Sequence, residues 1–216
     1  MKLIVQVLFV AAMSYSLEAL KMPAVGSGEL AKDFNDFLKL VPMKQALQVI
    51  KAYTAQDEEF QTSMAVMSLE EVRALVYNVE EAPQVSNMLY FMQNAGLDVY
   101  YILKRLHAHM NFLNSEVPSA VDAQISGGLA GLERDLKALV PLEQVKALLQ
   151  KKVAAGGAFA QFYKLWNNNE FRNYYSNLHR DVHVRVLVRI AELAHVNGVM
   201  FEKLFPVLLA IRHFAG

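Results

Sequence analysis

The strongest constraint on this chain is an internal repeat. The string DFLKLVP, which ends at Pro42, returns as DLKALVP, which ends at Pro141, 99 positions later. At the same offset Phe60 falls on Phe159, and apolar positions fall on apolar positions over most of the unit. Self-similarity at a fixed period is typical of a duplicated structural unit. The chain is therefore predicted to fold from two copies of one unit.

Each copy carries apolar stripes with helical spacing. One stripe in the first copy corresponds to a more aromatic stripe in the second. Only a helix brings positions with this spacing onto one side. Counting segments of this kind gives about six helices per copy, so we predict an all-α fold of about twelve short helices in two pseudo-symmetric six-helix repeats. The two stripes are Phe60, Met64 and Met67, and Phe159, Phe162, Tyr163 and Trp166.

Boundary residues predict where several of these helices begin. Pro42 and Pro141 each precede an apolar helical pattern, as prolines at helix starts often do. Ser68 with Glu71 predicts a capping box in the first copy. The asparagines at 167–169 supply the corresponding cap in the second copy, because an Asn side chain satisfies free N–H groups.

Three features near the end of each copy need separate interpretation. Aligning Gly96 with Gly198 implies a three-residue insertion before the last helix of the second copy. The segment 183–190, HVRVLVRI, alternates nearly as a strand would, but its partner around Met88 does not, so we expect a helix. Pro206 is expected to kink the last helix.

The two copies are predicted to form one globular unit. We place repeat 1 at 29–113, a Ser-, Pro- and Gly-containing linker at 114–127, and repeat 2 at 128–216. The run at 88–92, MLYFM, is apolar all round, and such a helix needs cover on more than one side. The other copy is the expected source of that cover.

The N-terminus has the layout of a cleavable signal peptide. Lys2 precedes an apolar run over 3–12, and small residues follow, so cleavage is expected after Ser16 or Ala19, with residues 1–19 as the signal. The alternatives are an ordinary helix or a membrane anchor, but the run is shorter than the ~20 apolar residues that a bilayer span needs. Secretion is the favoured interpretation.

Composition limits the partners. Lys plus Arg and Asp plus Glu both number 21, and no long charged run occurs, which disfavours electrostatic binding of nucleic acid. The chain is 54% hydrophobic and has no cysteine, so a secreted form would depend on packing rather than on disulfides.

No pattern of catalytic residues stands out. A Gly-x-Ser-x-Gly elbow and the glycine patterns of phosphate and dinucleotide sites are missing. His179 and His183 lie four apart with Asp181 nearby, but the HExxH signature is missing, so we predict no metal site. His107 and His109 are two apart and would point in different directions on one helix.

The ten Met and twelve Phe residues have two readings. Stripes at helical spacing ordinarily pack into a core, and the residues alone favour that reading. Thioether side chains also adapt to irregular shapes, which suits the lining of an apolar ligand cavity.

Three segments carry a family resemblance: DFNDFLKLVP, DEEFQTSMAVMSLEEVRALV and QNAGLDVYYILKRLH. In them, and over most of 33–214, the chain resembles the insect allergen-related repeat proteins, which include the cockroach group 1 allergen and mosquito midgut microvillar, blood-meal-induced proteins. The resemblance is stronger in the first copy than in the second.

That resemblance implies helices wrapped around a large hydrophobic cavity that holds fatty acids or phospholipid, in a protein secreted to the insect midgut lumen or microvillar surface. It also implies no catalytic residue, no cofactor and no metal, and we expect a monomer. Under this interpretation the cavity lining is drawn from the apolar stripes. The residues expected to bind lipid are Met64, Met67, Met88, Met92, Phe159, Phe162, Trp166, Leu187 and Phe201.

Mosquito members of the family are associated with lysis of red cells, so lipid membranes become an expected partner through lipid exchange. Two alternatives are kept. One is a structural or interaction protein of the microvillar surface with a filled core, and the other is an enzyme-like activity such as that of the butterfly nitrile-specifier protein. No residue in this sequence carries the latter.

Overall fold

The computed structural model describes residues 21–110 and 124–214, which form helices and, within these ranges, no strand. The all-α prediction is confirmed, including the helix over 183–190. None of the described helices is both long and apolar enough to cross a membrane. The helices are α2 Glu29–Leu38, α3 Met43–Gln56, α4 Glu58–Val66, α5 Glu70–Glu81, α6 Pro83–Asn94, α7 Val99–Met110, α8 Gly128–Ala138, α9 Leu142–Ala154, α10 Ala158–Trp166, α11 Asn169–Leu178, α12 Val182–Leu193 and α13 Gly198–Phe214.

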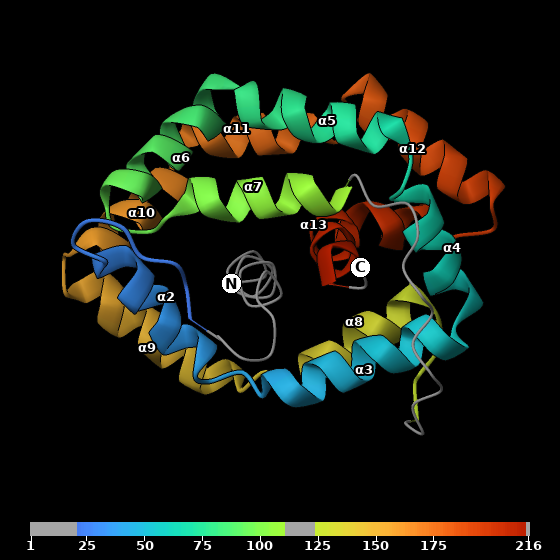
Figure 1. Cartoon of the computed structure of the whole chain (residues 1–216), viewed down its shortest axis with the longest axis horizontal. Helices are drawn as coiled ribbons and strands as arrows, with labels where there is room; N and C mark the ends of the chain where they lie inside the picture. The colour runs from blue at the N-terminus through green and yellow to red at the C-terminus, as the bar shows by residue number, and fades with distance from the viewer. Residues whose placement is uncertain (1–20, 111–123, 215–216) are drawn as a thin grey trace.

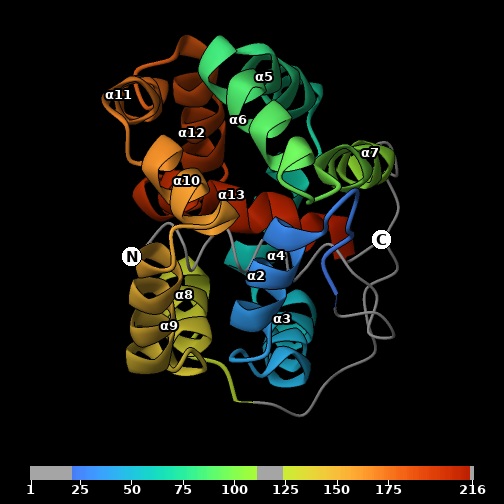
Figure 2. The ribbon, with the colours of Figure 1, turned by 90° about the vertical axis from the view of Figure 1, so that its left-hand side faces the viewer.

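The helices are stacked in two outer layers with a middle layer between them (Figures 1 and 2). One outer layer holds α2, α3, α8 and α9, and the other holds α5, α6, α11 and α12. Between them lie α4, α7, α10 and α13. Each layer therefore contains helices from both halves of the chain.

Helix starts follow the sequence repeat. Each of the six helices in the first half has a counterpart that begins 99 residues later, or 100 in the case of α4 and α10. Pro42 and Pro141 precede α3 and α9 with the same backbone conformation, φ −75° in both and ψ 76° and 79°. This order supports the predicted duplication, and superposition of the two halves in space stays a prediction.

Packing between the halves is reciprocal. Helix α2 contacts α9 and α10, and its counterpart α8 contacts α3 and α4. Likewise α4 contacts α12, and its counterpart α10 contacts α6. Helix α6, which contains the whole apolar run at 88–92, is thus covered by α10 and α11 of the other half as well as by α5 and α7.

The capping prediction was right in the second copy and wrong in the first. Asn168 accepts a hydrogen bond from the Phe171 N–H at 2.7 Å and caps α11. In the first copy Leu69 occupies the cap position of α5 without a side-chain cap. Ser68 instead lies in the turn that follows α4 and donates its hydroxyl proton to the carbonyl of Met64 at 3.0 Å.

The predicted three-residue insertion before the last helix is wrong. Gly96 has φ 95°, and the residue 99 positions later, His195, is the only described non-glycine residue with positive φ, at 64°. The backbone hydrogen bonds that close the two turns also correspond. The Leu97 N–H donates to the carbonyl of Met92, and the Val196 N–H donates to the carbonyl of Ala191. The structural counterpart of Gly96 is therefore a histidine, which amino-acid identity does not reveal.

The start of the last helix confirms this register. Asp98 Oδ1 accepts from the Tyr101 N–H, and Asn197 Oδ1, 99 positions later, accepts from the Met200 N–H. Pro206 lies inside α13. The predicted signal peptide at 1–19 and most of the predicted linker lie outside the described residues.

Candidate functional site

The predicted lipid-binding residues fall on two groups of packed helices. One group is α6 with α10, and it carries Met88, Met92, Phe159, Phe162 and Trp166. Met88, Phe159 and Phe162 are buried, and Met92 and Trp166 are half-buried against the core.

The second group consists of α4, α12 and α13, which contact one another. Met64 lies on α4, Met67 directly follows that helix, Leu187 lies on α12 and Phe201 on α13. Met64 is half-buried and the other three are buried. Because α4 is the counterpart of α10 and α12 that of α6, the two groups occupy matching places in the two halves of the chain.

A cluster of aromatic rings connects the first group to α2 and α11. The Phe34 ring lies 5.3 Å from that of Phe162 and 5.8 Å from that of Phe159, both edge-on. Trp166, the only tryptophan of the chain, continues the cluster with its ring 5.8 Å from Phe162 and 4.6 Å from Phe171. Rings at these separations stabilise one another beyond their buried area.

The described core is almost free of polar groups. Asp57 and Ser63 are the buried polar residues in the part of the chain that the structure describes. Asp57 accepts from the N–H groups of Phe60 at 2.7 Å and Gly128 at 2.6 Å, and Ser63 donates to a backbone carbonyl. Both side chains are therefore hydrogen-bonded within the protein.

Two glutamates join the halves of the chain through contacts that the sequence did not predict. Glu59 of α4 accepts from the backbone N–H groups of Leu129 at 3.0 Å and Asn197 at 2.7 Å, at the starts of α8 and α13. Glu29 of α2 accepts from the Ala158 N–H at the start of α10. Carboxylates suit these places because helix N-termini expose unpaired donors. No local pattern in the sequence reveals a partner 70 positions away.

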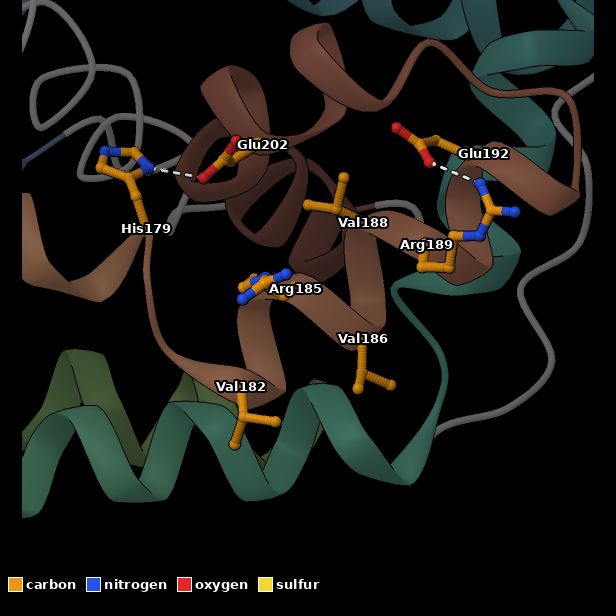
Figure 3. A pocket seen from close by; sticks show the side chains of 8 residues that line it. All are labelled: His179, Val182, Arg185, Val186, Val188, Arg189, Glu192 and Glu202. Carbon is orange, nitrogen blue, oxygen red and sulfur yellow. Dashed lines mark hydrogen bonds and ion pairs between the residues drawn. The ribbon is translucent and has the colours of Figure 1, made fainter.

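A surface pocket, here named the α12 pocket, opens between α11, α12 and α13 (Figure 3). Its volume is about 560 Å³. His179 Nδ1 lies 2.6 Å from Glu202 Oε1 at one side, and Arg189 Nη1 donates to Glu192 Oε2 at 3.1 Å at the other. The lining residues are His179, Val182, Arg185, Val186, Val188, Arg189, Glu192 and Glu202.

The histidine pair considered as a metal site has other contacts. Asp181 Oδ1 accepts from the His183 N–H at 2.8 Å and caps α12, while His179 is paired with Glu202. Within the described residues no three side chains are grouped as metal ligands would be.

A second pocket of about 550 Å³, here named the α7 pocket, lies among residues of α5, α6 and α7. His107 Nε2 lies 2.9 Å from Glu80 Oε1 there, and the Tyr77 ring packs against the imidazole at 4.7 Å. Burial raises the pKa of Glu80, and the hydrogen bond with His107 partly opposes that shift. The remaining lining residues are Glu81, Ser86, Leu89, Tyr100, Leu103 and Lys104.

Comparison with known proteins relates the chain to a protein family and to a mosquito protein. The family described as "insect allergen related repeat, nitrile-specifier detoxification" matches residues 29–201. "Protein G12" of Anopheles gambiae is 26% identical over 145 residues, which cover 64% of this chain and 67% of that protein.

Proposed function

The chain belongs to the insect allergen-related repeat family, and from that premise we propose that it is a secreted, non-enzymatic lipid-binding protein of the insect midgut. It holds fatty acyl chains or phospholipid in an apolar interior lined by the two groups of residues described above. Its place of action is the gut lumen or the microvillar surface.

The observation that carries this proposal is the apolar character of the described interior. Its two buried polar residues, Asp57 and Ser63, are already bonded. Such an interior favours hydrocarbon, because transfer of an acyl chain out of water contributes about 0.8 kcal/mol per buried CH2 group.

Three of the proposed lining residues are suited to contact a ligand. Met64, Met92 and Trp166 pack against the core while part of each side chain stays exposed. Flexible thioether chains adapt to ligands of different shapes. A family of acyl chains, rather than one rigid molecule, is the ligand class that this lining accommodates.

Mass spectrometry of lipid extracted from the purified native protein tests the proposal first. Stoichiometric fatty acid or phospholipid, absent from a matched control protein, is the expected result. The delipidated protein is then titrated with oleate while the fluorescence of Trp166, the single tryptophan, is followed. Protein that is lipid-free as purified and also gives no saturable change with oleate would contradict the proposal.

Exchange of bound fatty acid for membrane phospholipid would extend this function to lysis. The fatty-acid-loaded protein is expected to release dye from phosphatidylcholine vesicles, and the delipidated protein is expected to release much less. Equal release by both forms would separate lysis from lipid carriage.

An interaction protein of the microvillar surface is the second candidate. It is favoured by large apolar side chains left exposed near α12, with Val182 64%, Leu193 66% and Val199 76% exposed. Native mass measured before and after organic extraction distinguishes the two functions. A carrier loses the mass of a lipid, whereas a protein partner accounts for a far larger difference.

The non-enzymatic assignment has its own test. His179→Gln and His183→Gln are expected to leave oleate uptake unchanged, because neither side chain belongs to the proposed lining. An activity lost in these variants while uptake persists would instead indicate an enzyme.

A further inference from the structure

The α12 pocket and the α7 pocket occupy matching positions in the two halves of the chain. Four lining positions of one pocket lie 99 residues from lining positions of the other, and the volumes, about 560 and 550 Å³, are nearly equal. The duplicated unit therefore carries this pocket twice. The paired positions are Glu80 with His179, Ser86 with Arg185, Leu89 with Val188, and Leu103 with Glu202.

Each pocket uses one histidine–carboxylate pair to connect its helices. In the α7 pocket Glu80 accepts from His107, and in the α12 pocket His179, the counterpart of Glu80, pairs with Glu202. The acid and the base have exchanged helices. These groups satisfy each other in both pockets and are not free for a ligand.

The charged side chains differ between the pockets. The lining of the α7 pocket contains one cation, Lys104, and two acids, Glu80 and Glu81. In the α12 pocket Arg189 pairs with Glu192, so Arg185 is left as a cation without a carboxylate partner among the described residues. The position of Ser86 in the first copy has thus become a positive charge in the second.

The apolar part of the α12 pocket lies beside this cation. Val182 is 64% and Val186 45% exposed, and Val188 extends from the same helix (Figure 3). The exposed valines next to Arg185 present a hydrocarbon surface that ends at a positive charge. The volume lies within the range of about 300–1,000 Å³ that small-molecule pockets span.

We propose that the α12 pocket binds a monomeric anionic amphiphile. The guanidinium of Arg185 receives the carboxylate of the ligand, and the first methylene groups lie against Val182, Val186 and Val188. Arginine suits this role because its planar donor groups match a carboxylate in a bidentate arrangement. The site lies outside the proposed interior lining, so it does not depend on lipid carriage there.

Octanoate is the probe, followed through the methyl NMR signals of valine-labelled full-length protein. Saturable shifts of the Val182 and Val186 signals are expected, with a dissociation constant on the order of 1 mM because the pocket is open and the ligand small. Arg185→Gln is expected to weaken binding about tenfold, and Arg185→Lys less, since a lysine keeps the charge but not the bidentate geometry.

Lys104→Gln is the control, because it removes a positive charge from the α7 pocket instead, and it should change octanoate affinity less than about twofold. The proposal is overturned if Arg185→Gln binds octanoate as the wild type does, or if both variants weaken binding equally. It is also overturned if the signals respond only to vesicles containing phosphatidylserine. Oleate uptake measured through Trp166 is a separate readout, so failure here and failure of the proposed function are distinguishable.

Discussion

Lys152 Nζ lies 2.5 Å from Asp33 Oδ1 and so joins α9 to α2, although 119 positions separate the two residues. The same ammonium group donates to Asp36 Oδ2 at 2.6 Å. One cation therefore bridges two carboxylates one helical turn apart. Both halves of the chain contribute to this bridge, and it lies in the outer layer formed by α2, α3, α8 and α9.

Lys152→Met is expected to lower the free energy of unfolding by about 1–2 kcal/mol, because two partly buried carboxylates lose their shared partner. Urea denaturation of the variant and wild type measures this difference. Lys151→Met, at the exposed neighbouring position, is the control and should change stability by less than about 0.5 kcal/mol. Equal stability of all three proteins would contradict the structural role of the bridge.

Acid should weaken the bridge. The hydrogen bond from Lys152, followed by that from Lys39, lowers the pKa of Asp36 below its ordinary value of 3.8. The ionised form is therefore favoured by folding, and its contribution is complete above the pKa of the unfolded chain and lost as pH falls through the folded-state pKa. Urea denaturation between pH 6 and 2 should show that the free energy of unfolding falls less in Lys152→Met than in the wild type. An identical fall in both proteins would argue against the Lys152–Asp36 bond as the source of the acid sensitivity.

On the alkaline side the bridge should persist. Burial lowers the pKa of Lys152, but the hydrogen bonds to Asp33 and Asp36 outweigh this effect and raise the pKa above 10.5. The contribution of Lys152 is thus present below 10.5 and is lost only as pH rises through the higher folded-state value.

Glu59→Gln is expected to destabilise the protein by about 2 kcal/mol. The carboxylate accepts from the backbone N–H groups of Leu129 and Asn197, and an amide has one acceptor oxygen and no charge with which to replace these bonds. Thermal and urea unfolding provide the measurement. Glu58→Gln removes an exposed charge from the first turn of the same helix and should cost far less. A similar cost for both variants would point to the helix dipole rather than to the cross-half contacts.

His195→Gly should stabilise the protein by about 0.5–1 kcal/mol, because glycine adopts the positive φ of this turn without strain. Gly96→Ala at the corresponding turn should do the opposite. A Cβ atom there would lie 2.5 Å from the backbone nitrogen of Gly28 and 2.8 Å from that of Glu29. Chemical denaturation measures the free energy of unfolding of both variants. A stabilised Gly96→Ala protein would refute the proposed need for glycine at this positive φ.

Met92→Gln is expected to weaken oleate binding about fivefold, because a polar amide replaces apolar contact in the proposed lining. Met92 is half-buried, so the fold should tolerate the change. Tyr90→Gln, at an exposed position of the same helix, should leave affinity unchanged. Titration of Trp166 fluorescence compares the three proteins, and equal affinities would remove Met92 from the site.

The sequence by itself determined the helical class, the twofold order of helices and most of their starts. These features depend on contacts between residues a few positions apart, so the spacing of Phe60, Met64 and Met67 already encodes a helix face. The predicted three-residue insertion was wrong because backbone conformation, rather than residue type, relates His195 to Gly96. Two different residues can occupy the same turn when the surrounding hydrogen bonds stabilise it.

Only the tertiary structure decided which distant groups meet. No local pattern connects Glu59 to Asn197 or Lys152 to Asp33, because such contacts depend on how whole helices pack after their apolar faces are buried. The same packing left Arg185 beside exposed valines with no carboxylate partner among the described residues, although Arg189, one turn later on the same helix, pairs with Glu192. A helix face that packs into a core and one that lines a ligand site have the same apolar spacing in the sequence. The periodicity therefore predicts the helix but not whether its apolar face contacts other side chains or a ligand.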